Sequence, residues 1–141
     1  KSKELNVGLH SKVKNSKFQF LIIDSFGKMD EFYNKSDIVV LGGSFTNNGG
    51  HNPIEAAMAN CAIITGPNIF NWQNLYDDMI KKNCCLMIKN SKELEHNIIN
   101  LIEDKSLISD LKQNALSFSE SVFFDEDELL NIIKTNLEYN A

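Results

Sequence analysis

A glycine-rich loop at residues 42–55 holds the residues of this chain whose types and spacing best suit chemistry. Gly49 and Gly50 come just before a predicted helix start, and glycine lets the backbone take positive φ and lets a ligand approach bare amides. Free N–H groups at a helix start attract anions such as phosphate or carboxylate. The alternative is a tight strand-to-helix turn in which the glycines serve only backbone geometry. The coincidence of four glycines with a polar run favours an anion-binding loop; that run includes His51, Asn52 and Glu55.

The loop is expected to leave a strand and enter a helix. Residues 38–41 form an apolar run typical of a buried strand, and residues 54–59 favour a helix. Asn52 can cap that helix with its side-chain oxygen, and Pro53 suits the first helical position, where its missing N–H has no partner. Glu55 stands where a capping-box carboxylate would reach back to the helix start.

Further short apolar runs alternate with helical patterns along the chain. They cover residues 18–23, 61–65 and 85–88. Short apolar strands alternating with helices predict a Rossmann-like α/β fold, with a parallel sheet flanked by helices and joined by right-handed crossovers. In such sheets ligands bind beyond the carboxyl ends of the strands. We therefore expect the loop at residues 24–27, the glycine-rich loop and the turn at Gly66-Pro67 to gather at one edge and form one site.

Several helices are predicted from apolar residues at helical spacing. Residues 1–17 are lysine-rich and carry Leu5, Leu9 and Val13 at that spacing, which predicts a helix before the first strand. A short helix is expected near Phe32, and another over residues 71–82. Phe70, Trp72 and Tyr76 are assigned to the core, although Phe70-Asn71 follows Gly66-Pro67 closely enough to line the ligand-binding cleft instead. After the last strand, Ser91 is expected to cap one helix, and two more are expected over residues 107–118 and 129–137.

Composition excludes several classes of protein. The chain has 141 residues, 43% of them hydrophobic and 23% charged, which suits one soluble domain over residues 1–141. A net charge of −5 gives no general attraction to nucleic acid or anionic lipid. No apolar run reaches the roughly 20 residues of a membrane span, and no signal-peptide pattern is present. The cysteines, Cys61, Cys84 and Cys85, predict buried reduced thiols in the cytosol, and no cluster has metal-ligand spacing.

Five motifs stand in order between residues 20 and 80: Asp24-Ser25-Phe26-Gly27, Gly42-Gly43-Ser44, Gly49-Gly50-His51-Asn52-Pro53-Ile54-Glu55, Gly66-Pro67 and Phe70-Asn71. The third is the most specific. Together they resemble the donor-binding half of the bacterial Kdo transferases, a family that moves 3-deoxy-D-manno-octulosonic acid (Kdo) from CMP-Kdo to a lipid A precursor. One departure is Ala56, which stands where many relatives have proline and should change the helix little.

The resemblance implies a GT-B glycosyltransferase of lipopolysaccharide biosynthesis, with two Rossmann-like domains facing each other across a cleft. This chain would be the C-terminal, CMP-Kdo-binding domain. The acceptor site for the lipid A precursor, the general base and the membrane contact would lie in the missing N-terminal half, at the cytoplasmic face of the inner membrane. The chain alone is therefore expected to be soluble and inactive, with no cofactor and no catalytic residue assigned to it.

The chemistry of CMP-Kdo suggests what each candidate residue would do. Phosphate and sugar carboxylate need donors, which the loop amides, the loop hydroxyls and His51 would supply. Glu55 would accept hydrogen bonds from the ribose hydroxyls, or serve only the capping box, or do both. The resemblance also implies that backbone groups of the loop after the first strand read cytosine. The predicted binding residues are Gly27, Lys28, Met29, Gly43, Ser44, Thr46, Gly49, Gly50, His51, Asn52 and Glu55.

Two other functions remain open from the sequence. The same fold serves GT-B enzymes that use a UDP-sugar, and a preference for CMP over UMP and UDP would separate the two. The third possibility is a nucleotide-binding domain without catalysis. The basic nucleotide motif that the family carries upstream lies outside this chain, so weak affinity for CMP is expected.

Overall fold

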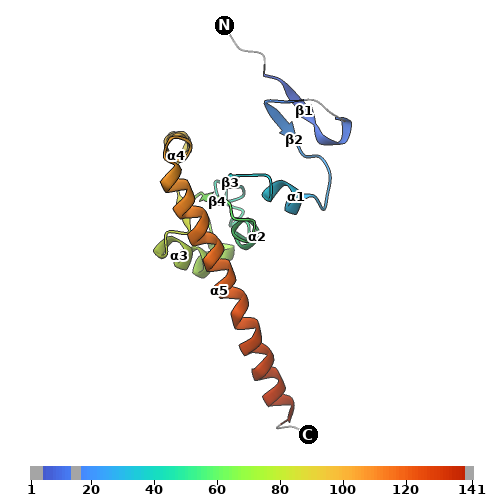
Figure 1. The fold of residues 1–141 in the computed structure, drawn as a ribbon, viewed down its shortest axis with the longest axis vertical. Helices are drawn as coiled ribbons and strands as arrows, with labels where there is room; N and C mark the ends of the chain where they lie inside the picture. The colour runs from blue at the N-terminus through green and yellow to red at the C-terminus, as the bar shows by residue number, and fades with distance from the viewer. Residues whose placement is uncertain (1–4, 14–16, 139–141) are drawn as a thin grey trace. The chain divides into compact units, whose positions relative to one another are not determined.

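The computed structural model describes residues 5–13 and 17–138, with side chains as far as residue 122. The chain divides into two compact units, Lys1–Phe32 and Tyr33–Ala141, which are described separately here and drawn in Figure 1. The glycine-rich loop belongs wholly to the second unit. Within the described residues, no helix combines the length and the apolar character that crossing a membrane requires.

The first unit is built on two short parallel strands separated by a 3-10 turn. Their bounds are β1 (Val7–Leu9), η1 (His10–Lys12) and β2 (Phe20–Ile22), and α1 (Met29–Tyr33) follows them. β1 and β2 pair in register, with Gly8 opposite Leu21. All of β2 is exposed in the described structure. The strand predicted at residues 18–23 is therefore present, in a slightly shorter form.

The helix predicted over residues 1–17 is wrong for residues 5–13, where β1 and η1 stand instead; the rest of that prediction at residues 1–4 and 14–16 lies outside the described residues. Gly8 supplies a physical reason, because glycine is a poor helix former. In β1 it also lets the Phe18 ring pack so close that a Cβ on Gly8 would stand 2.9 Å from it. Strand pairing has overridden a weak helical pattern.

The second unit has a three-stranded parallel sheet in the order β3–β4–β5. The strands are β3 (Ile38–Leu41), β4 (Ala62–Thr65) and β5 (Cys85–Met87). In the middle of the sheet, Ile63 pairs with Val39 on one side and with Cys85 on the other. Every residue of β4 is buried, as expected of a central parallel strand covered on both faces. The predicted parallel α/β arrangement is confirmed.

Helices cover both faces of this sheet. They are α2 (Ile54–Met58), the 3-10 turn η2 (Phe70–Trp72), α3 (Gln73–Lys81), α4 (Ser91–Glu103) and α5 (Lys105–Glu138). Successive side chains of a strand point to opposite faces, so β4 serves two cores. Ile63 packs in one core with Ala57 and Tyr76, whereas Ile64 packs in the other with Leu101. The long helix α5 packs against α2, β4 and α4 (Figure 1).

The C-terminal helices differ from the prediction at their ends. Asn90, not Ser91, caps α4: its side-chain oxygen accepts hydrogen bonds from the amides of Lys92 and Glu93 at 3.1 and 3.0 Å. Asn90 has the extended backbone that a cap requires, and Ser91 is already the first residue of the helix.

A single helix, α5, replaces the two predicted over residues 107–118 and 129–137. The stretch between them contains no glycine or proline, so nothing local stops the helix. Its serines do not act as caps. The hydroxyls of Ser119 and Ser121 instead donate back to the carbonyls of Leu116 and Phe118 within the helix, each at 2.7 Å.

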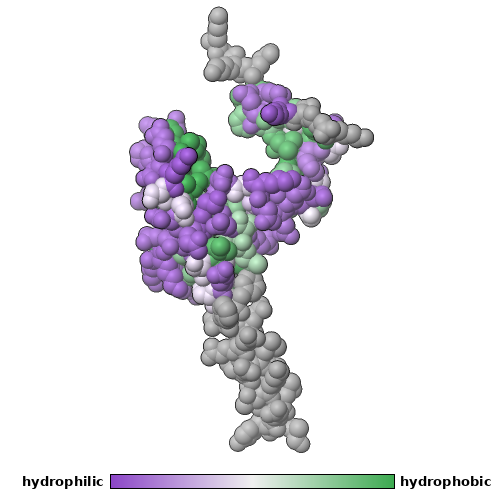
Figure 2. Space-filling view, in the orientation of Figure 1, coloured by the Kyte–Doolittle hydropathy of each residue, from purple (hydrophilic) through white to green (hydrophobic). Residues whose placement is uncertain are grey.

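Part of the predicted core is exposed in the structure. Tyr76 is buried as predicted, but Phe70 is 61% exposed and Trp72 38% exposed. Both aromatics lie in η2, which has no buried residue. The three cysteines are free and buried, as predicted. On the face shown in Figure 2, polar side chains cover most of the second unit, with apolar surface next to α4, a helix that exposes Ile99 and Ile102.

Candidate functional site

The glycine-rich loop leaves the carboxyl end of β3 and returns to the start of α2. Gly43, Gly49 and Gly50 have φ values of +71°, +80° and +76°, which side-chain-bearing residues rarely adopt. Gly49 has a second constraint, because a Cβ there would stand 2.5 Å from Cγ of Asn71. The predicted positive φ is confirmed at Gly49 and Gly50, and Gly43 adopts it as well.

Ser44 joins this loop to the turn that follows β4. Its hydroxyl donates to the carbonyl of Leu41 at 2.7 Å and accepts from the amide of Gly66 at 2.8 Å. Its carbonyl accepts from the amide of Asn68 at 2.9 Å. Within the second unit, the loops after β3 and β4 therefore meet at one edge of the sheet, as predicted. Ser44 itself is fully buried, with its hydroxyl engaged by the protein.

Two side chains of the segment η2–α3 hold the far end of the loop. The amide and side-chain nitrogen of Asn71 donate to the carbonyls of Gly49 and Asn48, at 3.1 and 2.9 Å. The hydroxyl of the buried Tyr76 donates to the carbonyl of His51 at 2.8 Å. The sequence analysis missed both contacts. Only the proximity of Phe70-Asn71 to Gly66-Pro67 along the chain hinted at the first.

The start of α2 partly matches the expected cap. The side-chain oxygen of Asn52 accepts from the amide of Ile54 at 3.0 Å, and Pro53 already has helical backbone angles. The capping-box contact of Glu55 is not formed: its carboxylate is exposed and has no hydrogen bond to the described residues. The helix has only five residues, so its dipole contributes less than the sequence suggested.

The amides of the loop are not all available to a ligand. The amide of Gly50 donates to the carbonyl of Gly43 at 3.3 Å and closes the loop, which corrects the expectation that the whole run from Gly49 to Asn52 offers free N–H groups. Gly49 is buried. The amides of His51 and Asn52 have no hydrogen-bond partner among the described residues, and they flank the exposed part of the loop.

Exposed side chains frame this part of the loop. His51 lies against the first glycines, since a Cβ on Gly43 would stand 3.6 Å from Cε1 of its ring, and its ring nitrogens have no hydrogen bond to the described residues. Thr46 is exposed, and its hydroxyl makes one long contact of 3.5 Å with the carbonyl of Gly43. With the Glu55 carboxylate, these groups offer a phosphate donor and a diol acceptor within one segment.

The remaining predicted residues, Gly27, Lys28 and Met29, precede or begin α1. Gly27 has a φ of +68° with open space around it, and the Lys28 ammonium stands 3.7 Å from the carboxylate of Glu31. Just before them, hydrogen bonds from the side chain and amide of Ser11 lower the pKa of Asp24. The assignment of this loop to the nucleobase stays a prediction.

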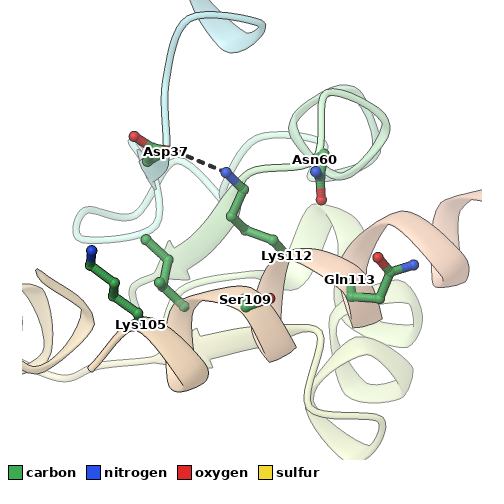
Figure 3. A pocket seen from close by; sticks show the side chains of 7 residues that line it. Asp37, Asn60, Lys105, Ser109, Lys112 and Gln113 are labelled. Atoms are coloured by element: carbon green, nitrogen blue, oxygen red, sulfur yellow. Dashed lines mark hydrogen bonds and ion pairs between the residues drawn. The ribbon is translucent and has the colours of Figure 1, made fainter. Parts of the chain in front are cut away.

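A second hollow, of about 360 Å³, lies at the opposite edge of the sheet, where β3 and β4 begin (Figure 3). Asp37 and Asn60 line it together with one face of α5. The Lys112 ammonium bonds Asp37 at 2.8 Å and lowers the pKa of that carboxyl. Lys105 also lines the hollow. Among the described residues, no group of three or more potential metal ligands gathers anywhere.

Sequence comparisons relate the chain to one family. It is 33% identical over 115 residues to a 3-deoxy-D-manno-octulosonic acid transferase of Rickettsia typhi, a match that covers 80% of this chain and 25% of that protein. The transferase of Haemophilus influenzae is 26% identical over 135 residues, covering 93% of this chain and 31% of the relative. The chain thus spans about a quarter of the length of these curated relatives. No family model matches it.

A solved structure shares the fold. The crystal structure of the C-terminal CMP-Kdo binding domain of WaaA from Acinetobacter baumannii matches with a TM-score of 0.76 and 24% identity, over 81% of this chain and 61% of that one. The resemblance inferred from the motifs is confirmed by both comparisons. The chain is therefore related to the Kdo transferases, corresponds to about a quarter of their length, and has the fold of the C-terminal domain of one of them.

Proposed function

We propose that this chain is the donor-binding part of a Kdo transferase and that it binds CMP-Kdo at the glycine-rich loop. One observation carries the proposal: in a chain similar to Kdo transferases over 80% of its length, the motif from Gly49 to Glu55 lies at the carboxyl edge of a parallel sheet and exposes His51 and Glu55 there. Ligands of such sheets bind at that edge.

In this proposal each exposed group of the loop has a role. The amides of His51 and Asn52, the His51 ring and the Thr46 hydroxyl donate to the phosphate or the sugar carboxylate. The Glu55 carboxylate accepts from the ribose hydroxyls, and this role is supported by its having no hydrogen-bond partner among the described residues. Gly43, Gly49 and Gly50 shape the backbone, while the buried Ser44 hydroxyl positions the loop without contacting the ligand.

The loop would also assist the reaction itself. When the bond between Kdo and CMP breaks, negative charge grows on the CMP phosphate, and fixed N–H donors stabilise such charge without having to reorganise. The complete enzyme would transfer Kdo to a lipid A precursor at the cytoplasmic face of the inner membrane. The acceptor site and the general base would come from the part of the enzyme outside this span, and residues 1–141 would act as one donor-binding domain.

The proposal is tested by titrating labelled protein with CMP, UMP and UDP while following backbone amides by NMR. We expect shifts from Gly49 to Glu55, strongest with CMP. The variants His51→Ala and Glu55→Gln should weaken CMP binding, whereas the controls His96→Ala and Glu95→Gln, on the exposed face of α4, should not.

Other outcomes would favour another function. Stronger shifts with UMP or UDP would indicate an enzyme that uses a UDP-sugar. If the loop amides are unmoved by all three nucleotides in a folded sample, either the loop is only a turn or binding requires the part of the enzyme outside this span. Repeating the titration on the full-length protein tells these two explanations apart. Nucleotide binding without transfer of Kdo in the full-length protein would indicate a binding domain without catalysis.

A further inference from the structure

We propose that Tyr76 and Asn71 are positioning residues, which brace the glycine-rich loop from behind and turn the Asn52 amide and the His51 side chain toward the donor. The inference rests on the proposed function for the identity of the ligand. The geometry of the brace does not depend on that identity, because its contacts lie entirely within the second unit.

The brace follows from which groups of the loop are held. Of the carbonyls near the loop's end, those of Asn48, Gly49 and His51 all accept hydrogen bonds from η2–α3, at 2.9, 3.1 and 2.8 Å. These contacts join residues 22 to 25 positions apart in the chain, from separate elements. The loop therefore takes its orientation from η2–α3, and the short helix α2 adds little to it.

A hydrogen bond that holds a carbonyl also fixes the direction of the N–H in the same peptide group. The chain has no cis peptide bond among the described residues, and in a planar trans peptide the C=O and N–H groups point in opposite directions. The carbonyl of His51 and the amide of Asn52 belong to the same peptide group. Because the Tyr76 hydroxyl holds that carbonyl from the buried side, the Asn52 N–H must face away from the core. No described residue accepts its hydrogen bond, so it remains available to an anion.

Tyr76 is well suited to this role. Its side chain is fully buried, so its position is set by packing, whereas the loop residues that it holds are more exposed. Burial raises the pKa of its hydroxyl to about 12, against a smaller opposing effect of the Thr65 side chain. The hydroxyl therefore stays a protonated donor at neutral pH, and the His51 carbonyl keeps its partner.

Asn71 acts at the preceding turn of the loop. Its side-chain nitrogen and its amide hold two successive carbonyls, and its Cγ occupies the space that a Cβ on Gly49 would need. Asn71 thus fixes the peptide groups on both sides of Gly49, where φ is +80°. Unlike Tyr76 it lies at an exposed position, so replacing it should disturb the loop without disturbing the core.

The test compares Tyr76→Phe with Asn90→Ala in the full chain. The first removes one hydroxyl, without changing the shape of the buried ring. The second removes the cap of α4, and so destabilises the chain through contacts that involve no residue of the glycine-rich loop. Two readouts are taken: the order of the His51 and Asn52 amides in the free protein, from the heteronuclear NOE, and the dissociation constant for CMP.

We expect Tyr76→Phe to lower the NOE at His51 and Asn52 and to weaken CMP binding about fivefold, the order of one hydrogen bond. Asn90→Ala should change neither readout, even with an equal loss of stability. Asn71→Ala should lower the NOE of the Asn48 and Gly49 amides. The control Gln73→Ala, at a nearby exposed position, should leave those amides unchanged.

Three outcomes are distinguishable. Ordered amides and unchanged CMP affinity in Tyr76→Phe would overturn the positioning role. Equal weakening by Tyr76→Phe and Asn90→Ala would also overturn it, because the effect would then follow global stability. A loosened loop in Tyr76→Phe, together with a full-length protein that binds none of CMP, UMP or UDP, would uphold the brace and refute the proposed donor site.

Discussion

Replacing Gly49 with alanine should destabilise the second unit more than the same change at Gly43. The positive φ of +80° costs an alanine about 1–2 kcal/mol. The new Cβ would also stand 2.5 Å from Cγ of Asn71, so the Asn71 side chain must move and give up its bond to the Asn48 carbonyl. That loss adds about 1 kcal/mol. We expect a total of about 2–3 kcal/mol.

The measurement is urea unfolding followed by circular dichroism, with Gly43→Ala as the matched control. Gly43 has nearly the same φ, +71°, but the nearest atom to its added Cβ is 3.6 Å away, an ordinary contact. Gly43→Ala should therefore cost only the backbone part. In an Asn71→Ala background, Gly49→Ala should fall to the same cost. Equal losses for Gly49→Ala and Gly43→Ala in the wild-type background would refute the reasoning.

Three further predictions test the framework around the loop. Ser44→Ala should lower the free energy of unfolding by about 2–3 kcal/mol in urea titrations, because it leaves a buried carbonyl and a buried amide without a partner; an unchanged midpoint would contradict this. Lys112 holds the pKa of Asp37 below its ordinary 3.8, so the pair stabilises the fold above that pH and the contribution is lost as pH falls through the lowered value. In wild type the urea midpoint should therefore fall as the pH drops below about 4, and in Lys112→Gln it should fall less over the same pH range. Burial raises the pKa of the Cys85 thiol to about 12, so a thiol reagent at neutral pH should label it only in unfolded protein, and rapid labelling of the native chain would show that β5 is open.

Local signals explain why so much of the second unit could be predicted. The strand at residues 38–41, the glycines and the helix start follow one another within a short stretch, and each depends on the residues next to it. Glycine acts through its own backbone where φ is positive, and Asn52 acts through its side chain on the amide of Ile54, two residues further along. The same holds for the apolar run of β4, whose burial follows from its composition.

The failed predictions share a physical cause, which is competition between local preference and distant partners. Residues 5–9 have a helical pattern, yet β1 forms because it can pair with β2. Serines in α5 stay within a helix that nothing interrupts. Glu55 does not form the capping-box contact predicted from its position, so its carboxylate stays exposed beside the loop.

By itself, the sequence determined the α/β class, the parallel order of strands and helices, the glycine-rich loop and the resemblance to the Kdo transferases. These depend on short motifs and on periodicity, which act over a few residues. Only the tertiary structure decided that Ser44 is a buried link, that the Gly50 amide is taken, and that Tyr76 and Asn71 hold the loop. The contacts of Gly66 with Ser44, Asn71 with Asn48 and Tyr76 with His51 join residues 22 to 25 positions apart, and no local pattern encodes which distant donor will meet a given acceptor. The bond from Gly50 to Gly43 is shorter in range, but it forms only because the loop folds back on itself.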